Sequence, residues 1–139
     1  MSERATVTNE RVDDIPLLLA QMERMGIPSL LDKFFPTHGN WQGLSLGWTA
    51  TVWLAHVLSE GDHRLNHVQP WAEKRLETLS RCIGQKVRAL DFSDDRLADV
   101  LSALGQDTAW DSFEAALLRE HWGIENRVFY VRDVSMDED

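Results

Sequence analysis

Apolar residues recur along much of the chain at spacings of three and four, which is the period of an amphipathic α-helix. Residues 15–25 show this pattern after two aspartates, a composition that suits the first turn of a helix. A second apolar stripe over residues 27–35 ends before Pro36. We therefore expect a helical hairpin, with Gly26 between its two helices.

The middle of the chain predicts a loop followed by an unusually apolar helix. Residues 37–43 contain glycine, asparagine and an isolated tryptophan, a composition typical of a loop. Ser45 is a candidate N-cap for a helix that begins at Leu46 and ends at Gly61. Because apolar residues cover much of its circumference, we expect this helix to lie at the centre of a bundle.

Two further helices are predicted beyond this point. Pro70 either begins a new helix in its first turn or kinks a longer one, and we favour a new helix that continues to Ile83. The order of cap, apolar stripe and stop is clearest over residues 93–105, where Ser93 precedes two aspartates and Gly105 follows the last leucine.

The last segment has two interpretations. Asp107 or Thr108 offers a cap, and apolar positions from Trp110 to Val131 keep spacings that favour one long helix. The alternative makes residues 128–134 a strand, since they are rich in β-branched and aromatic side chains.

These patterns predict a mainly α fold, a small helical bundle with a long C-terminal helix, or a helix plus a short strand. A chain of 139 residues suits one compact unit. We expect a polar, disordered N-terminus over residues 1–11, a helical domain over residues 12–105 and a C-terminal helical segment over residues 106–139.

The charge distribution limits nucleic-acid binding to one region. Fourteen basic residues against 23 acidic ones give a net charge of −9, which disfavours broad coating of DNA. Residues 71–90 are the exception, since basic side chains outnumber acidic ones there. The candidate DNA-binding residues are Lys74, Arg75, Arg81, Lys86 and Arg88.

Other residue types point to a protein of the cytoplasm without a membrane partner. Cys82 is the single cysteine, which excludes a disulfide framework and favours a buried structural thiol. No stretch has the signal-peptide pattern or the length of apolar sequence that a membrane span needs.

Histidines, tryptophans and aspartates each suggest a site and a simpler interpretation. His63 and His67 are four residues apart, a spacing found in zinc sites, but without a third ligand we interpret them as polar helix-surface residues. Most of the six tryptophans are expected in the core or an interface, and only Trp71 has basic neighbours suited to base stacking. We expect aspartates such as Asp91 to be helix caps or exposed.

Two segments of the sequence resemble one family. Residues 121–126 read His-Trp-Gly-Ile-Glu-Asn, and Arg-Asp-Val follows at residues 132–134. This string resembles the C-terminal signature of bacterial insertion-sequence transposases of the DDE, RNase H-like type. A looser similarity at residues 26–32 and 93–97 resembles the helical N-terminal domain that precedes the catalytic domain in one such group.

The resemblance implies specific roles and a specific gap. Glu125 corresponds to the third acid of the catalytic triad, with His121 beside it, and intact relatives use two magnesium or manganese ions. The partner aspartates would lie on an RNase H-like sheet, for which there is no room between Gly105 and Arg119. We therefore expect an internally deleted fragment that is inactive on its own and binds no metal in isolation.

Two functional hypotheses follow. The first is a transposase-derived protein that keeps a DNA-end binding or assembly domain and contacts element ends either weakly or through full-length transposase. Formation of a homo-oligomer stays open. The alternative is a helical interaction module that dimerises with full-length transposase or inhibits it. The tryptophan-rich helix around Trp48 and Trp53 motivates the alternative, since it has more apolar surface than a small bundle needs.

Overall fold

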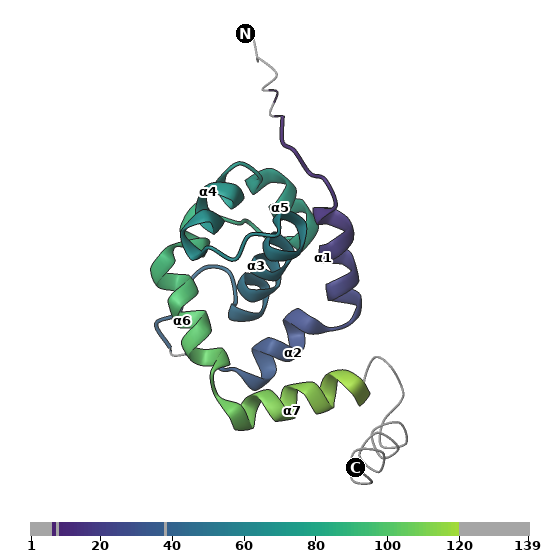
Figure 1. The fold of residues 1–139 in the computed structure, drawn as a ribbon, viewed down its shortest axis with the longest axis vertical. Coiled ribbons are helices and arrows are strands. Elements are labelled where there is room, and N and C mark those ends of the chain that lie inside the picture. The colour runs from purple at the N-terminus through teal and green to yellow at the C-terminus, as the bar shows by residue number, and fades with distance from the viewer. Residues whose placement is uncertain (1–6, 8, 38, 120–139) are drawn as a thin grey trace.

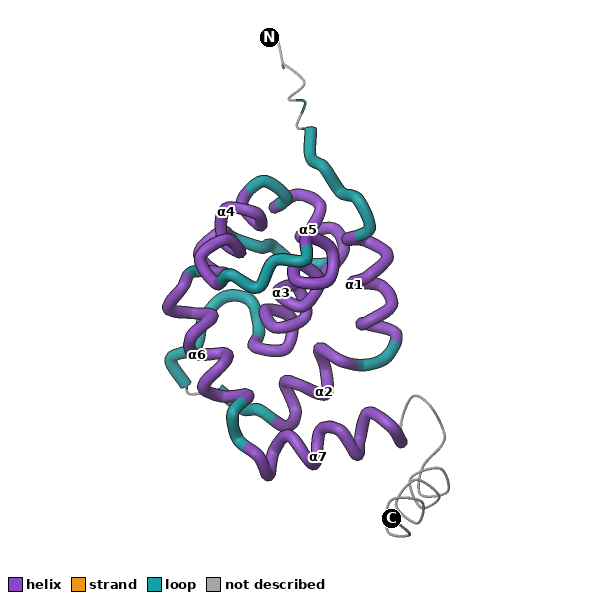
Figure 2. Tube along the Cα trace, viewed as in Figure 1, coloured by secondary structure: helices purple, strands orange, loops and turns teal. Residues whose placement is uncertain are grey.

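The chain folds as a helical bundle (Figures 1 and 2). The computed structural model describes residues 7, 9–37 and 39–119, and in these residues it contains α-helices and short 3₁₀ helices but no strand. The predicted mainly α fold class is confirmed. No helix in this part of the chain is long and apolar enough to cross a membrane. The elements in chain order are α1 (Ile15–Arg24), α2 (Ile27–Phe34), α3 (Leu46–Glu60), η1 (Leu65–His67), α4 (Val68–Glu73), α5 (Leu76–Ile83), η2 (Ala89–Phe92), α6 (Asp94–Leu104) and α7 (Asp107–Leu117).

Helix α3 lies at the centre of the molecule, as its apolar circumference predicts (Figure 1). It packs against α1, α2, α4 and α6. Ser45 is its N-cap, and the Ser45 hydroxyl accepts a hydrogen bond from the Trp48 N–H at 3.2 Å. Val52 and Ala55 in its middle turns are fully buried. The surrounding helices therefore bury their apolar faces against α3.

The core consists of two clusters that meet on α2 and α3. The first joins α1, α3, α4, α5, η2 and α6, and the second joins α2, the start of α3, α6 and α7. Ile27 and Trp53 are half-buried and pack against both clusters. The two clusters therefore form one continuous interior.

Helices α2 and α3 approach closely at Gly47. The Gly47 N–H donates to the Asp32 carboxylate at 2.7 Å. A Cβ atom at Gly47 would overlap the Pro28 carbonyl oxygen and lie only 2.9 Å from the Asp32 carboxylate. The absence of a side chain at this position permits the contact between the two helices.

The predicted helix from Pro70 to Ile83 is wrong as a single element. Helix α4 begins at Val68, with Pro70 in its first turn, and the chain leaves helical geometry at Arg75 before α5 begins. The Arg75 N–H donates to the Ala72 carbonyl, while the Arg75 guanidinium takes the Trp71 carbonyl at 3.0 Å. The Trp71 carbonyl, which would accept from the Arg75 N–H in a continuous helix, accepts from the Arg75 guanidinium instead.

The ends of α6 and α7 test the predicted caps. Ser93 caps α6, and its hydroxyl accepts from the Arg96 N–H at 3.2 Å, which confirms the prediction. The predicted cap at Asp107 or Thr108 is wrong, because α7 already begins at Asp107 after Gln106. The remainder of the predicted long helix and the alternative strand over residues 128–134 lie outside the described residues.

Residues on the outer side of both predicted limits of the helical domain, before residue 12 and after residue 105, contact the bundle. The Glu10 carboxylate accepts hydrogen bonds from the backbone N–H groups of Glu77 and Thr78, at 3.1 and 2.8 Å, and from the Thr78 hydroxyl at 2.6 Å. Glu10 thus caps α5, although it lies within the predicted N-terminal tail. At the other end, α7 packs against α2, so residues 107–117 belong to the same bundle.

The contacts of Glu10 also change its acidity. Burial raises the pKa of its carboxyl, but the hydrogen bonds from Thr78 and Glu77 outweigh burial and leave the pKa lowered. The charged form of Glu10 is therefore the one that caps α5.

Candidate functional site

Four of the five predicted DNA-binding cations are exposed. Lys74, Arg81, Lys86 and Arg88 lie at the surface of the region from α4 to η2. Arg75 differs, since only 7% of it is exposed and its guanidinium lies 4.9 Å from the centre of the Trp71 ring. Arg75 is therefore not accessible in the way that the other four cations are.

The fold positions these exposed cations by local contacts. Arg81, in the last turn of α5, is 3.9 Å from the Glu77 carboxylate, a surface pair of small energetic value that leaves the guanidinium accessible. The loop that carries Lys86 is held against α5, because the Val87 N–H donates to the Ser80 hydroxyl at 3.0 Å.

Arg88 is anchored by a buried acid. The Asp91 carboxylate is fully buried and accepts from the Arg88 N–H at 2.9 Å, the Arg88 guanidinium at 3.4 Å and the Leu44 N–H at 3.2 Å. Asp91 is the third residue of η2, and its carboxylate accepts from the backbone N–H of Arg88, the N-cap residue of that helix. It therefore acts at a helix start, as expected, but it is buried. The Asp91 carboxylate joins η2 to the loop before α3 and fixes the position of the Arg88 backbone.

The prediction that His63 and His67 both lie on a helix surface is wrong for His63. His63 is exposed in a loop, and η1 begins only at Leu65. The His67 Nδ1 atom is 2.7 Å from the Asp62 carboxylate, which also accepts from the Arg64 backbone and guanidinium. These hydrogen bonds, those from Arg64 first, hold the pKa of Asp62 well below its usual value. Among the described residues, no three His, Cys, Asp or Glu side chains are grouped so that they could hold a metal.

A cavity of about 620 Å³, with His67 in its lining, was missed by sequence reasoning. His56, Glu60, Asp62, Trp71 and Arg75 are among its lining residues. The His56 ring packs edge-on against Trp71, with 4.9 Å between ring centres, and burial lowers the pKa of His56 although Asp62 and Glu60 raise it. A histidine on an apolar helix gives no sequence signal for such a cavity.

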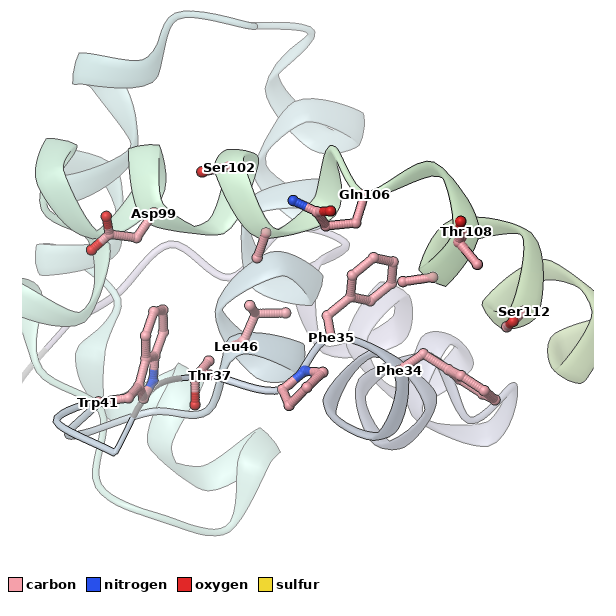
Figure 3. A pocket seen from close by; sticks show the side chains of 13 residues that line it. Phe34, Phe35, Thr37, Trp41, Leu46, Asp99, Ser102, Gln106, Thr108 and Ser112 are labelled. Atoms are coloured by element: carbon pink, nitrogen blue, oxygen red, sulfur yellow. The ribbon is translucent and has the colours of Figure 1, made fainter.

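An apolar groove of about 650 Å³ lies on another part of the surface, where α2 ends beside α6 and α7 (Figure 3). Phe35 and Trp41 are on one side of it, and Ser102 and Gln106 on α6 and the turn after it are on the other. The Phe35 ring contacts Trp110 and Phe113 at ring-centre distances of 5.9 and 6.1 Å. These aromatic contacts attach α7 to α2.

The two tryptophans of α3, which were expected to leave apolar surface exposed, are largely covered by other residues. Trp48 and Trp53 are half-buried and pack against the core, whereas the exposed apolar residues of α3 are Leu54 and Leu58. Trp71 is 7% exposed, with Arg75 over its ring, so it lies in the core, as expected for most of the tryptophans.

The remaining candidates are Cys82 and the transposase signature. Cys82 is half-buried, and burial raises the pKa of its thiol, as in a structural cysteine. Glu125 and His121 lie outside the described residues.

Comparison with known proteins identifies one family. A family model described as a domain of unknown function, DUF4277, matches residues 7–115. No curated protein and no solved structure matches the chain. The matched range includes Glu10 and most of α7, in agreement with the packing of both into the bundle. Because it covers well over half of the sequence, the chain belongs to the DUF4277 family, whose domain is found in transposase-like proteins.

Proposed function

We propose that this chain is a transposase-derived protein whose helical domain binds the DNA ends of a mobile element. The observation that carries the proposal is the exposure of Lys74, Arg81, Lys86 and Arg88 in an otherwise acidic chain. The occurrence of the domain in transposase-like proteins and the resemblance of residues 121–126 to a transposase signature support it.

The electrostatics of DNA binding predicts how the affinity should depend on salt concentration. Each cation that contacts a phosphate releases condensed counterions, so affinity falls with salt in proportion to the number of contacts. Four contacts predict a slope of about −3 to −4 in a plot of log affinity against log salt. The acidic remainder of the surface repels DNA and restricts the contact to the region from α4 to η2.

The test is a fluorescence anisotropy titration of the full chain with a short labelled duplex taken from the DNA that flanks the gene, where the proposal places an end of the mobile element. The Arg81→Ala, Lys86→Ala double variant is expected to weaken binding and to reduce the salt slope by about 2. Arg24→Ala, Lys33→Ala is the matched control, because it removes two exposed cations from α1 and α2.

Two results would contradict the proposal. Binding that does not change in the Arg81, Lys86 variant would exclude this surface. Equal losses in both double variants would show that only net charge matters.

The proposed function does not include strand cleavage. Cleavage of the transposase type needs two metal ions held by several carboxylates, and Glu125 is the only triad acid that the resemblance assigns. The same duplex is expected to remain intact with magnesium or manganese. Nicking that Glu125→Gln abolishes would overturn this expectation.

A second candidate function is assembly with another copy of the same domain. It is favoured by leucines exposed on α1 and α3, since Leu17, Leu54 and Leu58 are 72%, 42% and 58% exposed. Leu54 and Leu58 are one helical turn apart and share a face of α3. Light scattering after size-exclusion chromatography is expected to show a dimer that Leu58→Glu dissociates. A monomer at every concentration would exclude this candidate.

A further inference from the structure

The apolar groove where α2 ends beside α6 and α7 is charged at one end only. Figure 3 shows Asp99 and Trp41 at one end of the groove and Phe34 and Ser112 at the other. Of the described residues that line it, Asp99 alone is charged. The Asp99 side chain is exposed, and no other described residue pairs with its carboxylate. A segment that fills this groove therefore needs apolar side chains and, at the Asp99 end, a cation.

The surroundings of Asp99 favour arginine as that cation. A guanidinium has five N–H donors in one plane, so it can bond a carboxylate with two of them and other acceptors with the rest. The Ser102 hydroxyl and the Gln106 side-chain carbonyl are acceptors on the same wall of the groove, and both residues are exposed. Arg96 lies 4.2 Å from the centre of the Trp41 ring but is not among the residues that line the groove. The Asp99 carboxylate is therefore available to a cation from elsewhere.

The chain itself contains a segment of this composition. Residues 127–132, which lie outside the described residues, read Arg-Val-Phe-Tyr-Val-Arg. Four consecutive apolar residues thus stand between two arginines. An apolar run of this kind favours association with other molecules unless another surface covers it. The groove offers the apolar surface and the single carboxylate that complement the segment.

The chain is long enough to bring this segment to the groove. Helix α7 begins at the groove, where Thr108 and Ser112 line it, and its 11 residues extend about 17 Å. Arg119, the last described residue, follows the end of α7. The eight residues from there to Arg127 span up to about 26 Å when extended, so they can return along α7 to the groove. The segment would then meet the Ser112 end first and the Asp99 end last.

We propose that residues 127–132 of the same chain occupy the apolar groove. Residues 128–131 cover its aromatic side chains, and the Arg132 guanidinium pairs with the Asp99 carboxylate at the far end. Apolar burial supplies most of the binding free energy, while the ion pair fixes the direction in which the segment runs. The inference does not rest on the proposed DNA binding, because the cations proposed to contact DNA are not among the residues that line the groove.

Trypsin cleavage of the full chain tests this placement, since trypsin cuts after arginine only where the peptide bond is accessible. The rate of cleavage between Arg127 and Val128 is followed by mass spectrometry. It is compared with the rate in a synthetic peptide of residues 120–139. We expect cleavage in the folded chain to be about tenfold slower or more, because docking withholds the bond from the protease. This protection should not depend on protein concentration.

Two substitutions in the groove should remove the protection. Asp99→Arg brings like charges together and Ser102→Trp fills the groove with a bulky ring, so each should raise the cleavage rate about tenfold. The matched controls are Asp111→Arg and Ala98→Trp, at exposed positions of α7 and α6 that do not line the groove, and they should leave the rate unchanged. Asp99→Arg combined with Arg132→Asp exchanges the two charges and should restore the protection.

The outcomes separate the possible occupants of the groove. Cleavage after Arg127 at the rate of the free peptide would overturn the proposal, as would unchanged protection in folded Asp99→Arg and Ser102→Trp. A charge exchange that fails to restore protection would also contradict it. Protection that increases with protein concentration would assign the groove to the segment of a second copy and overturn the proposal. All four substituted groove and control positions are exposed, so we expect melting temperatures close to that of the unsubstituted chain.

Discussion

A single carboxylate, that of Asp91, joins segments that are far apart in the sequence. It accepts from Leu44, 47 residues earlier, and from Arg88 within its own turn. Gly43 lies directly beside it, with a φ of +82°, and a Cβ atom there would overlap the carboxylate and approach the Arg88 guanidinium. Glycine at position 43 and aspartate at position 91 therefore depend on each other.

Replacement of Asp91 should be costly. Asp91→Ala leaves the buried N–H groups of Leu44 and Arg88 without an acceptor, so we expect the free energy of unfolding to fall by about 2–4 kcal/mol. Urea denaturation followed by circular dichroism measures the change. Asp94→Ala, at an exposed position in the first turn of α6, is the control and should cost less than about 1 kcal/mol. Equal losses in both variants would contradict this assignment.

The contrast between Ser93 and Asp91 shows which residue roles the sequence predicts. Ser93 bonds a backbone group three residues away, so its role as a cap is visible in local spacing. The burial of Asp91 depends on Leu44, which no local pattern connects to it. The contact between the His56 and Trp71 rings belongs to the same class, because only the packing of α3 against α4 brings these side chains together.

At the scale of elements, the close contact of α2 with α3 depends on Gly47. Helix boundaries at Ser45 and Ser93 follow from capping rules, and the sequence predicts both. The break between α4 and α5 was not predictable in this way. At the break, Arg75 is buried and its guanidinium donates to the Trp71 carbonyl, an arrangement that no local sequence pattern indicates.

Gly47→Ala tests the helix contact. Alanine stabilises an isolated helix by about 1 kcal/mol relative to glycine, but the added carbon overlaps the Pro28 carbonyl. We expect a net loss of about 1–3 kcal/mol in the free energy of unfolding. Gly105→Ala is the matched control, since its φ is −75° and no atom lies within 3.5 Å of the added Cβ. That control should change stability by less than about 1 kcal/mol. Equal effects at positions 47 and 105 would argue against a close contact.

At the scale of the whole molecule, the two core clusters share Ile27 and Trp53. We therefore expect the bundle to unfold as one unit, which permits a single free energy to be measured under each condition. The net charge of −9 is a property of the whole chain, and it does not reveal that the region from α4 to η2 is basic. The sequence predicts that region, but no local pattern indicates that Arg75 within it is buried.

The pH dependence of this free energy should reveal His56. Burial lowers the pKa of His56 in the folded state, so below about pH 6.5 the unfolded chain binds more protons at this position. The free energy of unfolding should therefore fall as the pH is lowered from 7 through the histidine range. Stability contributed by the lowered pKa values of Glu10 and Asp62 is lost only at lower pH, below the ordinary carboxyl range.

Urea titrations at a series of pH values measure this dependence. His56→Gln should flatten the curve between neutral and mildly acidic pH, while His63→Gln, at an exposed position, should leave it unchanged. A curve with the same slope in His56→Gln would assign the effect to another group.

The contact of Glu10 with α5 has a practical consequence for recombinant versions of the domain. A shortened protein that begins at Val12 would expose the first amide groups of α5 to water, at a cost of about 0.5–2 kcal/mol. Cloning boundaries, purification tags and protease sites should therefore leave Glu10 and its neighbours in place.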